Sequence, residues 1–252
     1  MWHLKGKKAL VTGGTKGIGC AVVEELLALE AFVLFVARNK NAVTALEKKW
    51  QKKGKTIYGI AADVSSTKDR ERILQFVSSH FKTLDILVNN AGINIRKKAL
   101  EYTEDEYQKI IAVNLLAPFE LSRMFYPLLK KAQAASIINI ASSAGIQDVR
   151  SGAPYAMAKA GILQQTRSLA TEWASDGIRV NAVSPWYTQT PLTQPVFEQK
   201  ERLDYIIKRT PMQRVAQPEE IAAVVAFLSM DKASYITGQN LIADGGMSIS
   251  AL

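Results

Sequence analysis

Residues 9–19 read ALVTGGTKGIG, an apolar run that leads into a loop with glycines in the spacing G-x-x-x-G-x-G. The apolar residues predict a buried β-strand, and a helical pattern follows the loop. Glycine permits a tight turn and lets backbone N–H groups approach a phosphate at the start of a helix. An ordinary strand-to-helix turn is the alternative. The residues expected at this phosphate site are Gly13, Thr15, Lys16, Gly17, Ile18 and Gly19.

The same alternation of a short apolar run and a helical pattern continues along the chain. Most runs are continuously apolar, which is typical of strands covered on both faces. Expected strands cover residues 9–11, 32–36, 56–61, 86–88, 136–140, 178–183 and 240–242, and expected helices cover residues 18–29, 68–80, 104–129, 155–174 and 218–229. This order predicts an α/β fold, a Rossmann-type doubly wound parallel sheet of seven strands with helices on both faces, in a single domain. Ligands should bind at the carboxyl ends of the strands.

The second expected strand ends in a cation. A dinucleotide site that prefers NAD usually places an acid at this strand end, on the ribose hydroxyls. This chain has Ala37 there, followed by Arg38 and Asn39. Arg38 can bind a 2′-phosphate bidentately, with Lys16 as a second cation, so the pattern predicts NADP(H) as the cofactor. A solvated loop arginine is the alternative.

The third and fourth expected strands end in small and polar residues. Asp63-Val64 is placed to meet the edge of an adenine ring, and Asn90-Ala91-Gly92 allows the backbone to approach a ribose. Asn, Asp and Gly also dominate ordinary turns, so turn chemistry is the alternative at both strand ends.

A serine, a tyrosine and a lysine surround the end of the fifth expected strand. Ser142 follows the strand, Tyr155 comes thirteen residues later, and Lys159 lies four residues further on the same helix face. The pattern Y-x-x-x-K alone is weak, because Tyr126 and Lys130 repeat it. That second pair lacks a serine-bearing strand end upstream and is interpreted as a packed tyrosine with a surface lysine. The position of Tyr155 therefore favours a catalytic role.

Composition excludes several classes of protein. The 252 residues are 48% hydrophobic and 22% charged, which suits a buried core and not a disordered chain. The net charge of +9 comes from scattered basic residues. The densest groups, at residues 48–55 and 96–98, are interpreted as a solvated basic surface, so we expect no nucleic-acid partner. The sequence has neither a membrane-spanning apolar run nor a signal-peptide pattern, so we expect no membrane partner and a cytoplasmic location. His3, His80 and Cys20 form no metal-ligand cluster, and one cysteine allows no intrachain disulfide.

Together these residues resemble the short-chain dehydrogenase/reductase family over nearly the whole chain. Within that family the stretches SLATEWASDGIRVNAVSP, TPMQRVAQPEEIAAVVAFL and ASYITGQ are similar to the tropinone-reductase-like group. The matching positions are the glycine loop, Asp63, residues 89–92, Asn114, Ser142, Tyr155, Lys159, residues 179–181, Pro185, residues 235–238 and residues 244–246. The resemblance implies one domain over residues 1–252, with a cofactor half at about 1–150, a catalytic and substrate half at about 151–252, and a substrate lid at about 190–212.

The resemblance also implies a mechanism, in which NADPH delivers hydride to the carbon of a ketone. Tyr155 would donate the proton to the carbonyl oxygen, and Ser142 would orient that oxygen. Lys159 would bind the nicotinamide ribose and lower the pKa of Tyr155. Asn114 would hold a water that links Lys159 to solvent. Further nicotinamide contacts are implied for Pro185, Thr188 and Thr190.

The substrate pocket departs from the family pattern. The family usually has glycine after the proline, whereas this chain has Trp186, which is either a pocket wall or a side chain packed against the following helix. The expected pocket residues are Ser142, Trp186, Tyr187, Leu192 and Phe197. A cyclic or bicyclic, tropinone-like ketone is the implied substrate. A homotetramer or homodimer is implied, with the helices over 104–129 and 155–174 at an interface.

Two other functions stay open. One is a 3-oxoacyl-[acyl-carrier-protein] reductase, weakened by Asp176, since many such enzymes carry a basic residue there. The other is a non-catalytic NADPH-binding regulator, because a fold does not fix a function. The set of Ser142, Tyr155, Lys159 and Asn114 weakens this second alternative, since a sensor needs no proton relay.

Overall fold

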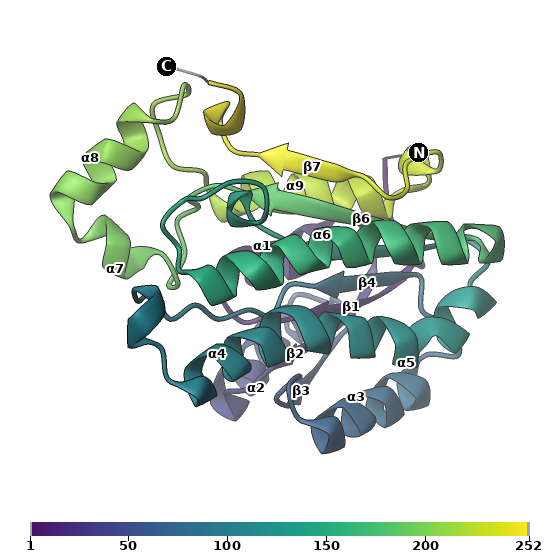
Figure 1. Ribbon diagram of the computed structural model, residues 1–252. Helices are drawn as coiled ribbons and strands as arrows, with labels where there is room; N and C mark the ends of the chain where they lie inside the picture. Colours follow the sequence, from purple (N-terminus) through teal and green to yellow (C-terminus); the bar gives the residue numbers. More distant parts are fainter. Residues whose placement is uncertain (1, 251–252) are drawn as a thin grey trace.

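The computed structural model describes residues 2–250 and contains a parallel sheet of seven strands in the order β3-β2-β1-β4-β5-β6-β7 (Figure 1). The strands are β1 (Lys8–Thr12), β2 (Phe32–Ala37), β3 (Ile57–Ala61), β4 (Ile86–Asn89), β5 (Ala135–Ile140), β6 (Ile178–Pro185) and β7 (Asn240–Ala243). All the expected strands are confirmed, with ends that differ by at most two residues. The order reverses at β1, which pairs with β2 on one side and β4 on the other. Ligands of such sheets bind beside a reversal of this kind.

Helices cover both faces of the sheet (Figure 1). On one face lie α1 (Gly17–Ala28), α2 (Lys40–Gln51) and α9 (Pro218–Ser229), and on the other lie α3 (Thr67–His80), α4 (Glu104–Ile111), α5 (Ala117–Lys131) and α6 (Ala153–Trp173). Strand β2 shows why the apolar runs are continuous. Val33 and Phe35 enter the core under α1, whereas Leu34 and Val36 enter the core under α3 and α5. Both faces of a strand are therefore buried, as expected for a doubly wound sheet.

The helix expected over residues 104–129 is not continuous. A π-helical turn at Ala112–Leu116 separates α4 from α5. Pro118 has no N–H and cannot donate the α-helical hydrogen bond to the carbonyl of Asn114. The turn thus lies where the regular ladder is broken. Helix α2 was not among the expected helices, because its sequence is rich in lysine and buries only Val43 fully.

Two short helices follow β6. They are α7 (Gln194–Phe197) and α8 (Lys200–Lys208), within the segment expected to form a lid, and neither was expected as a helix. Figure 1 shows both beyond the carboxyl ends of the strands, apart from the layers that cover the sheet. Tyr187, Val196 and Ile206 form a small separate core beneath them. None of the helices within residues 2–250 is long and apolar enough to span a membrane.

Candidate active site

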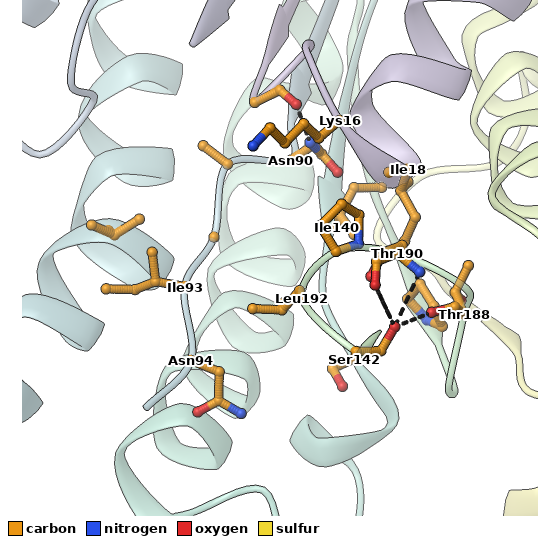
Figure 2. A pocket seen from close by; sticks show the side chains of 18 of the residues that line it. Lys16, Ile18, Asn90, Ile93, Asn94, Ile140, Ser142, Thr188, Thr190 and Leu192 are labelled. Carbon is orange, nitrogen blue, oxygen red and sulfur yellow. Dashed lines mark hydrogen bonds between the residues drawn. The ribbon is translucent and has the colours of Figure 1, made fainter. Parts of the chain in front are cut away.

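A cavity of about 600 Å³ opens at the carboxyl ends of the strands, beside the reversal of strand order (Figure 2). Its walls come from the loops that follow β1 to β6. All the residues assigned from the sequence to a cofactor, catalytic or substrate site line it except Gly19, Asn114 and Phe197. Because the carboxyl ends of parallel strands lie at one edge of the sheet, they bring together residues from six separate segments.

The glycine loop is tightly packed against the loop after β4. Gly13 has a φ of 70°, and a Cβ at this position would lie 2.8 Å from Nδ2 of Asn90. Gly19 does not line the cavity because it is buried behind the loop, where a Cβ would collide with Asn90 and the carbonyl of Gly13. Helix α1 begins without a side-chain cap on its N–H groups, and the exposed Lys16 stands at that end. This is a suitable site for a phosphate.

Arg38 and Asn39 follow β2 at one end of the cavity. Asn39 caps α2 by accepting a hydrogen bond from the N–H of Ala42 (2.9 Å). Arg38 is exposed, and no residue between 2 and 250 pairs with its guanidinium. An exposed, unpaired arginine with no neighbouring acid on the same strand end can accept an anion from solution.

Hydrogen bonds fix the ends of β3 and β4. Oδ1 of Asp63 accepts from the N–H and hydroxyl of Ser65 (2.9 and 2.7 Å). Thr12 accepts the N–H groups of Asn90 and Ala91 on its hydroxyl, at 3.0 Å each. The side chain of Asn90 donates to the Thr12 carbonyl (2.9 Å). Asn90 therefore holds the glycine loop in place, and Ala91 and the neighbouring glycine face the cavity.

Lys159 and Tyr155 lie together on the first turns of α6. Lys159 is buried, donates to the carbonyl of Ile140 (2.7 Å), and its Nζ lies 5.6 Å from the centre of the Tyr155 ring. Burial lowers the pKa of Lys159 to about 8. Burial raises the pKa of Tyr155, while the Ser142 hydroxyl and the charge of Arg96 act to lower it. The expected depression of the Tyr155 pKa by Lys159 is therefore absent from the protein alone, because desolvation of the phenolate dominates.

Asn114 lies behind this pair, in the π-helical turn. It is fully buried and joins the loop after β4, accepting from the N–H of Ile93 (3.1 Å) and donating to its carbonyl (2.8 Å). A Cβ on Gly92 would lie 2.8 Å from Oδ1 of Asn114 and 3.9 Å from Nζ of Lys159. Glycine at position 92 is thus the reason that Asn114 and Lys159 can approach the same loop.

Replacement of Lys159 should change stability in a pH-dependent way. In the folded protein its pKa is about 8, against 10.5 for a free lysine, so the unfolded chain binds more protons between these values. The charged lysine therefore costs folding free energy below about pH 8, and the cost disappears as the pH rises toward about 10. We expect Lys159→Met to stabilise the cofactor-free protein by about 2 kcal/mol near pH 7, after subtracting its lost hydrogen bond. Urea unfolding of both proteins at several pH values measures this difference, and a pH-independent difference would contradict the burial of a charged amine.

Some of the expected substrate residues line the cavity and one does not. Trp186 combines both alternatives: it lines the cavity, donates from Nε1 to Thr210 (3.1 Å), and packs edge-on against Tyr187 with ring centres 4.7 Å apart. Leu192 lines the cavity. Phe197 does not, because it turns toward the core beneath the lid and packs against Tyr187, 6.1 Å between ring centres. The structure therefore does not bring Phe197 into the wall of this cavity.

Outside the lid segment, three polar residues that the sequence analysis did not identify also line the cavity. They are Asn94 and Arg96, on the loop after β4, and Ser151, on the loop before α6. Sequence contained a signal only for Arg96, in the basic group at residues 96–98, which was interpreted as a solvated surface. Within residues 2–250 no group of three His, Cys, Asp or Glu side chains could hold a metal ion.

Comparison with known proteins finds reductases and dehydrogenases that match nearly the whole chain. A family model described as enoyl-(acyl carrier protein) reductase matches residues 13–248. A tropinone reductase homologue of Arabidopsis thaliana is 45% identical over 250 residues, 99% of this chain and 95% of that protein. Another, from Datura stramonium, is 42% identical over 253 residues, 99% of this chain and 94% of that protein. A crystal structure of a gluconate 5-dehydrogenase from Burkholderia cenocepacia, in complex with NADP and tartrate, has a TM-score of 0.95 at 27% identity and covers 99% of this chain and 98% of its own.

Proposed function

This chain belongs to the short-chain dehydrogenase/reductase family of oxidoreductases, and we propose that it reduces a ketone to an alcohol with NADPH. The observation that carries this proposal is the grouping of Ser142, Tyr155 and Lys159 around one end of the cavity, with Asn114 directly behind. The hydroxyl follows the end of β5, whereas the phenol and the amine stand on the first turns of α6, and the three groups have no shared structural task that would bring them together. Such a convergence of polar groups in a cavity is typical of an active site.

The chain's own residues would divide the work as follows. Tyr155 donates its proton to the carbonyl oxygen, and Ser142 hydrogen-bonds the same oxygen and orients it. Lys159 has ammonium hydrogens left after its bond to Ile140 and can donate them to a ribose. When NADPH is bound, it supplies the hydride that the carbonyl carbon accepts. Proton and hydride must reach one carbonyl in one geometry, which a rigid α6 beside a rigid sheet favours.

Proton supply to Tyr155 would pass through Lys159. The pKa of about 8 for Lys159 lies close to neutrality, which suits a group that must both give and accept a proton. The interrupted helix contributes the next step, since Pro118 leaves the carbonyl of Asn114 without its α-helical donor. That carbonyl can then accept from a water beside Lys159. We place Asn114 in the active site for this reason, although its side chain is occupied by Ile93.

The cavity residues fit a phosphorylated dinucleotide. Gly13 and Gly17 adopt positive φ values of 70° and 52°, so the loop leaves room for a pyrophosphate at the start of α1. Asp63 keeps a carboxylate oxygen for the adenine, and Arg38 with Lys16 would bind the 2′-phosphate. Pro185, Thr188 and Thr190 would meet the nicotinamide end. The gluconate 5-dehydrogenase neighbour, whose structure contains NADP, supports the same coenzyme here.

The lid assignment has independent support from packing. The Thr193 hydroxyl donates to the carbonyls of Thr188 and Thr190, which ties the start of the segment to the cavity wall. The rest of the segment packs on the small core of Tyr187, Val196 and Ile206. We propose that residues 190–212 cover the substrate, within the catalytic half that begins near residue 151.

The test of the proposed function is direct. Purified protein is mixed with NADPH and a panel of cyclic, bicyclic and open-chain ketones, and NADPH consumption is followed by absorbance. We expect turnover of at least one ketone and isolation of the corresponding alcohol. NADPH binding without turnover of any ketone would favour the non-catalytic regulator instead. A cytoplasmic location is part of the proposal, and cell fractionation tests it.

We also propose a homo-oligomer that uses α4, α5 and α6. Of the apolar residues on these helices, Leu163 and Leu169 belong to the core, whereas Leu116 and Phe119 are 53% and 40% exposed. Exposed apolar side chains that gather on neighbouring elements are typical of a subunit interface. We expect Phe119→Asp to lower the molar mass measured by light scattering to that of a smaller assembly. Leu100→Asp, at a fully exposed site outside these helices, should leave the mass unchanged. An unchanged mass for Phe119→Asp would exclude this interface.

A further inference from the structure

The cavity contains a cation that the proposed reaction does not use. Arg96 lies on the loop after β4, lines the cavity and is partly buried. Its Nε is buried without a hydrogen-bond partner, and neither of its terminal nitrogens pairs with any residue between 2 and 250. A buried guanidinium N–H without an acceptor costs folding free energy, so its retention in a cavity points to an acceptor that arrives with the ligand.

The neighbouring residue on the same loop, Lys97, does have an acidic partner. Lys97 forms an ion pair with Glu106 at 2.6 Å, whereas no acid among residues 2–250 pairs with Arg96. The backbone around Arg96 is fixed by Tyr102, whose hydroxyl donates to the carbonyl of Ile95 (2.5 Å) and accepts from the N–H of Lys97 (3.2 Å). The peptide groups on both sides of Arg96 are thus held by one hydroxyl. The backbone of Arg96 is therefore fixed, so its side chain leaves the loop from a defined point beside the cavity.

Two further unpaired polar atoms lie in the same part of the cavity. Oδ1 of Asn94 and Oγ of Ser151 are buried without a partner. The two residues are adjacent, because Nδ2 of Asn94 donates to the carbonyl of Ser151 (3.1 Å). Figure 2 shows Asn94 at the opposite end of the cavity wall from Asn90 and Lys16, and therefore away from the glycine loop. Asn94 stands two residues before Arg96 on the same loop, so we assign these three residues to one polar end of the cavity, which a dinucleotide seated on the glycine loop would leave to the substrate.

The charge at this polar end selects the sign of the ligand. Arg96 acts electrostatically on Tyr155, which places its positive charge near the reacting group. Among the described residues that line the cavity, Asp63 is the only carboxylate, and it lies at the end of β3, on the adenine side. A ketone with a protonated amine, as a tropinone-like substrate would be, finds a like charge here and no acid to pair with. An anion finds a planar, unpaired guanidinium that can bind it through two parallel hydrogen bonds.

We propose that the substrate is an oxo acid, a ketone whose carboxylate is bound by Arg96 while its carbonyl oxygen lies between Ser142 and Tyr155. Ser151 is a further donor for the carboxylate, and Oδ1 of Asn94 can accept a hydroxyl of the substrate. This inference rests on the proposed reductase function and names its substrate class. It replaces the amine-bearing bicyclic ketone that the sequence resemblance implies.

The test compares short oxo acids of increasing chain length, each with its own methyl ester, as substrates with NADPH. We expect kcat/KM for the best acid to exceed that of its ester by at least about tenfold, since the ester leaves the guanidinium unpaired. Arg96→Met should lower kcat/KM for the acid by about 10–100-fold and change that of the ester by no more than about twofold. Arg96→Lys keeps the charge but not the bidentate geometry. Its kcat/KM for the acid should therefore lie between those of wild type and Arg96→Met.

Lys98→Met is the matched control. Lys98 stands two residues after Arg96, is exposed and does not line the cavity, so its replacement removes one positive charge outside the site. It should leave the acid-to-ester ratio at the wild-type value. An ester reduced as efficiently as its acid by wild type would overturn the inference and leave the reductase function intact. The same losses in Lys98→Met and Arg96→Met would also overturn it, since the effect would then come from overall charge.

A binding measurement separates the inference from the proposed function. Isothermal titration of the oxo acid into protein saturated with NADP⁺ requires no turnover. Binding to wild type that weakens at least about tenfold in Arg96→Met supports the carboxylate site even if no ketone is reduced. Equal binding by wild type and Arg96→Met, with both variants shown folded by their melting curves, overturns it.

Discussion

Tyr155→Phe is expected to lower kcat by at least about 10²–10⁴-fold while NADPH still binds with nearly wild-type affinity. Only the phenolic hydroxyl can carry the proton, and the ring that packs beside Lys159 is retained. Tyr155 is half-buried in the cavity wall, next to the Ser142 hydroxyl. Steady-state kinetics with the best ketone gives kcat, and fluorescence titration of NADPH gives the dissociation constant. Together they separate loss of chemistry from loss of binding.

Tyr126→Phe is the control for this prediction. Tyr126 has the same spacing to a lysine, but its hydroxyl donates to Asp176 (2.6 Å) and Lys130 pairs with the same carboxylate (2.7 Å). This cluster stands at the end of α5 and does not line the cavity. The variant should therefore keep kcat near the wild-type value. If Tyr155→Phe retained more than about a tenth of wild-type kcat, Tyr155 would not be the proton donor.

The strand ends could be predicted from sequence because their chemistry is local. Val33 to Val36 are apolar on both faces, which identifies a strand buried between two helical layers. A parallel sheet then brings the carboxyl end of every strand to one edge, so Arg38, Asp63 and Ser142 are expected along that edge. For this reason the cavity lining agrees with the sequence assignments at most positions.

The remaining features depend on contacts between distant segments. Phe197 lies outside the cavity wall because its direction is set by packing on Tyr187, which no local pattern reports. Arg96 was interpreted as part of a solvated basic surface because it stands in a run with Lys97 and Lys98. The difference between Arg96 and Lys97 comes from Glu106 and from the Tyr102 hydroxyl, both in later segments. Spacing likewise carries no information on desolvation, which raises the pKa of Tyr155 in the protein alone.

The helix interruption at Asn114 is an intermediate case. Pro118 was visible in the sequence, and a proline inside a helical pattern predicts a kink or break. The pattern over residues 104–129 nevertheless favoured one helix, because its apolar periodicity continues on both sides of the π-helical turn. Structure was needed to show that the turn lies beside Gly92 and Lys159. A break in a regular element thus coincided with the proposed active site.

Coenzyme choice provides the second large effect. Wild-type protein should prefer NADPH to NADH by about 10² or more in kcat/KM, since Arg38 and Lys16 can each give the 2′-phosphate a charge-assisted hydrogen bond. Arg38 has no partner between residues 2 and 250, so no internal ion pair must break before it binds. Arg38→Asp should lower kcat/KM with NADPH by at least about 10²-fold. The new carboxylate repels the 2′-phosphate and cannot donate the hydrogen bonds of the guanidinium. The same carboxylate can accept the ribose hydroxyls of NADH, so the preference should reverse.

Lys40→Asp isolates the local effect of Arg38 from overall charge. Lys40 is an exposed lysine two residues further, at the start of α2, and it does not line the cavity. The charge change equals that of Arg38→Asp, so a difference between the two variants reports direct contact with the phosphate. Dissociation constants for both coenzymes, from fluorescence titration, accompany the kinetics and require no ketone. Equal affinity of wild type for NADPH and NADH would mean that Arg38 points to solvent in the complex. Equal losses in the two variants would instead mean that the preference is long-range electrostatics, which added salt would abolish in both.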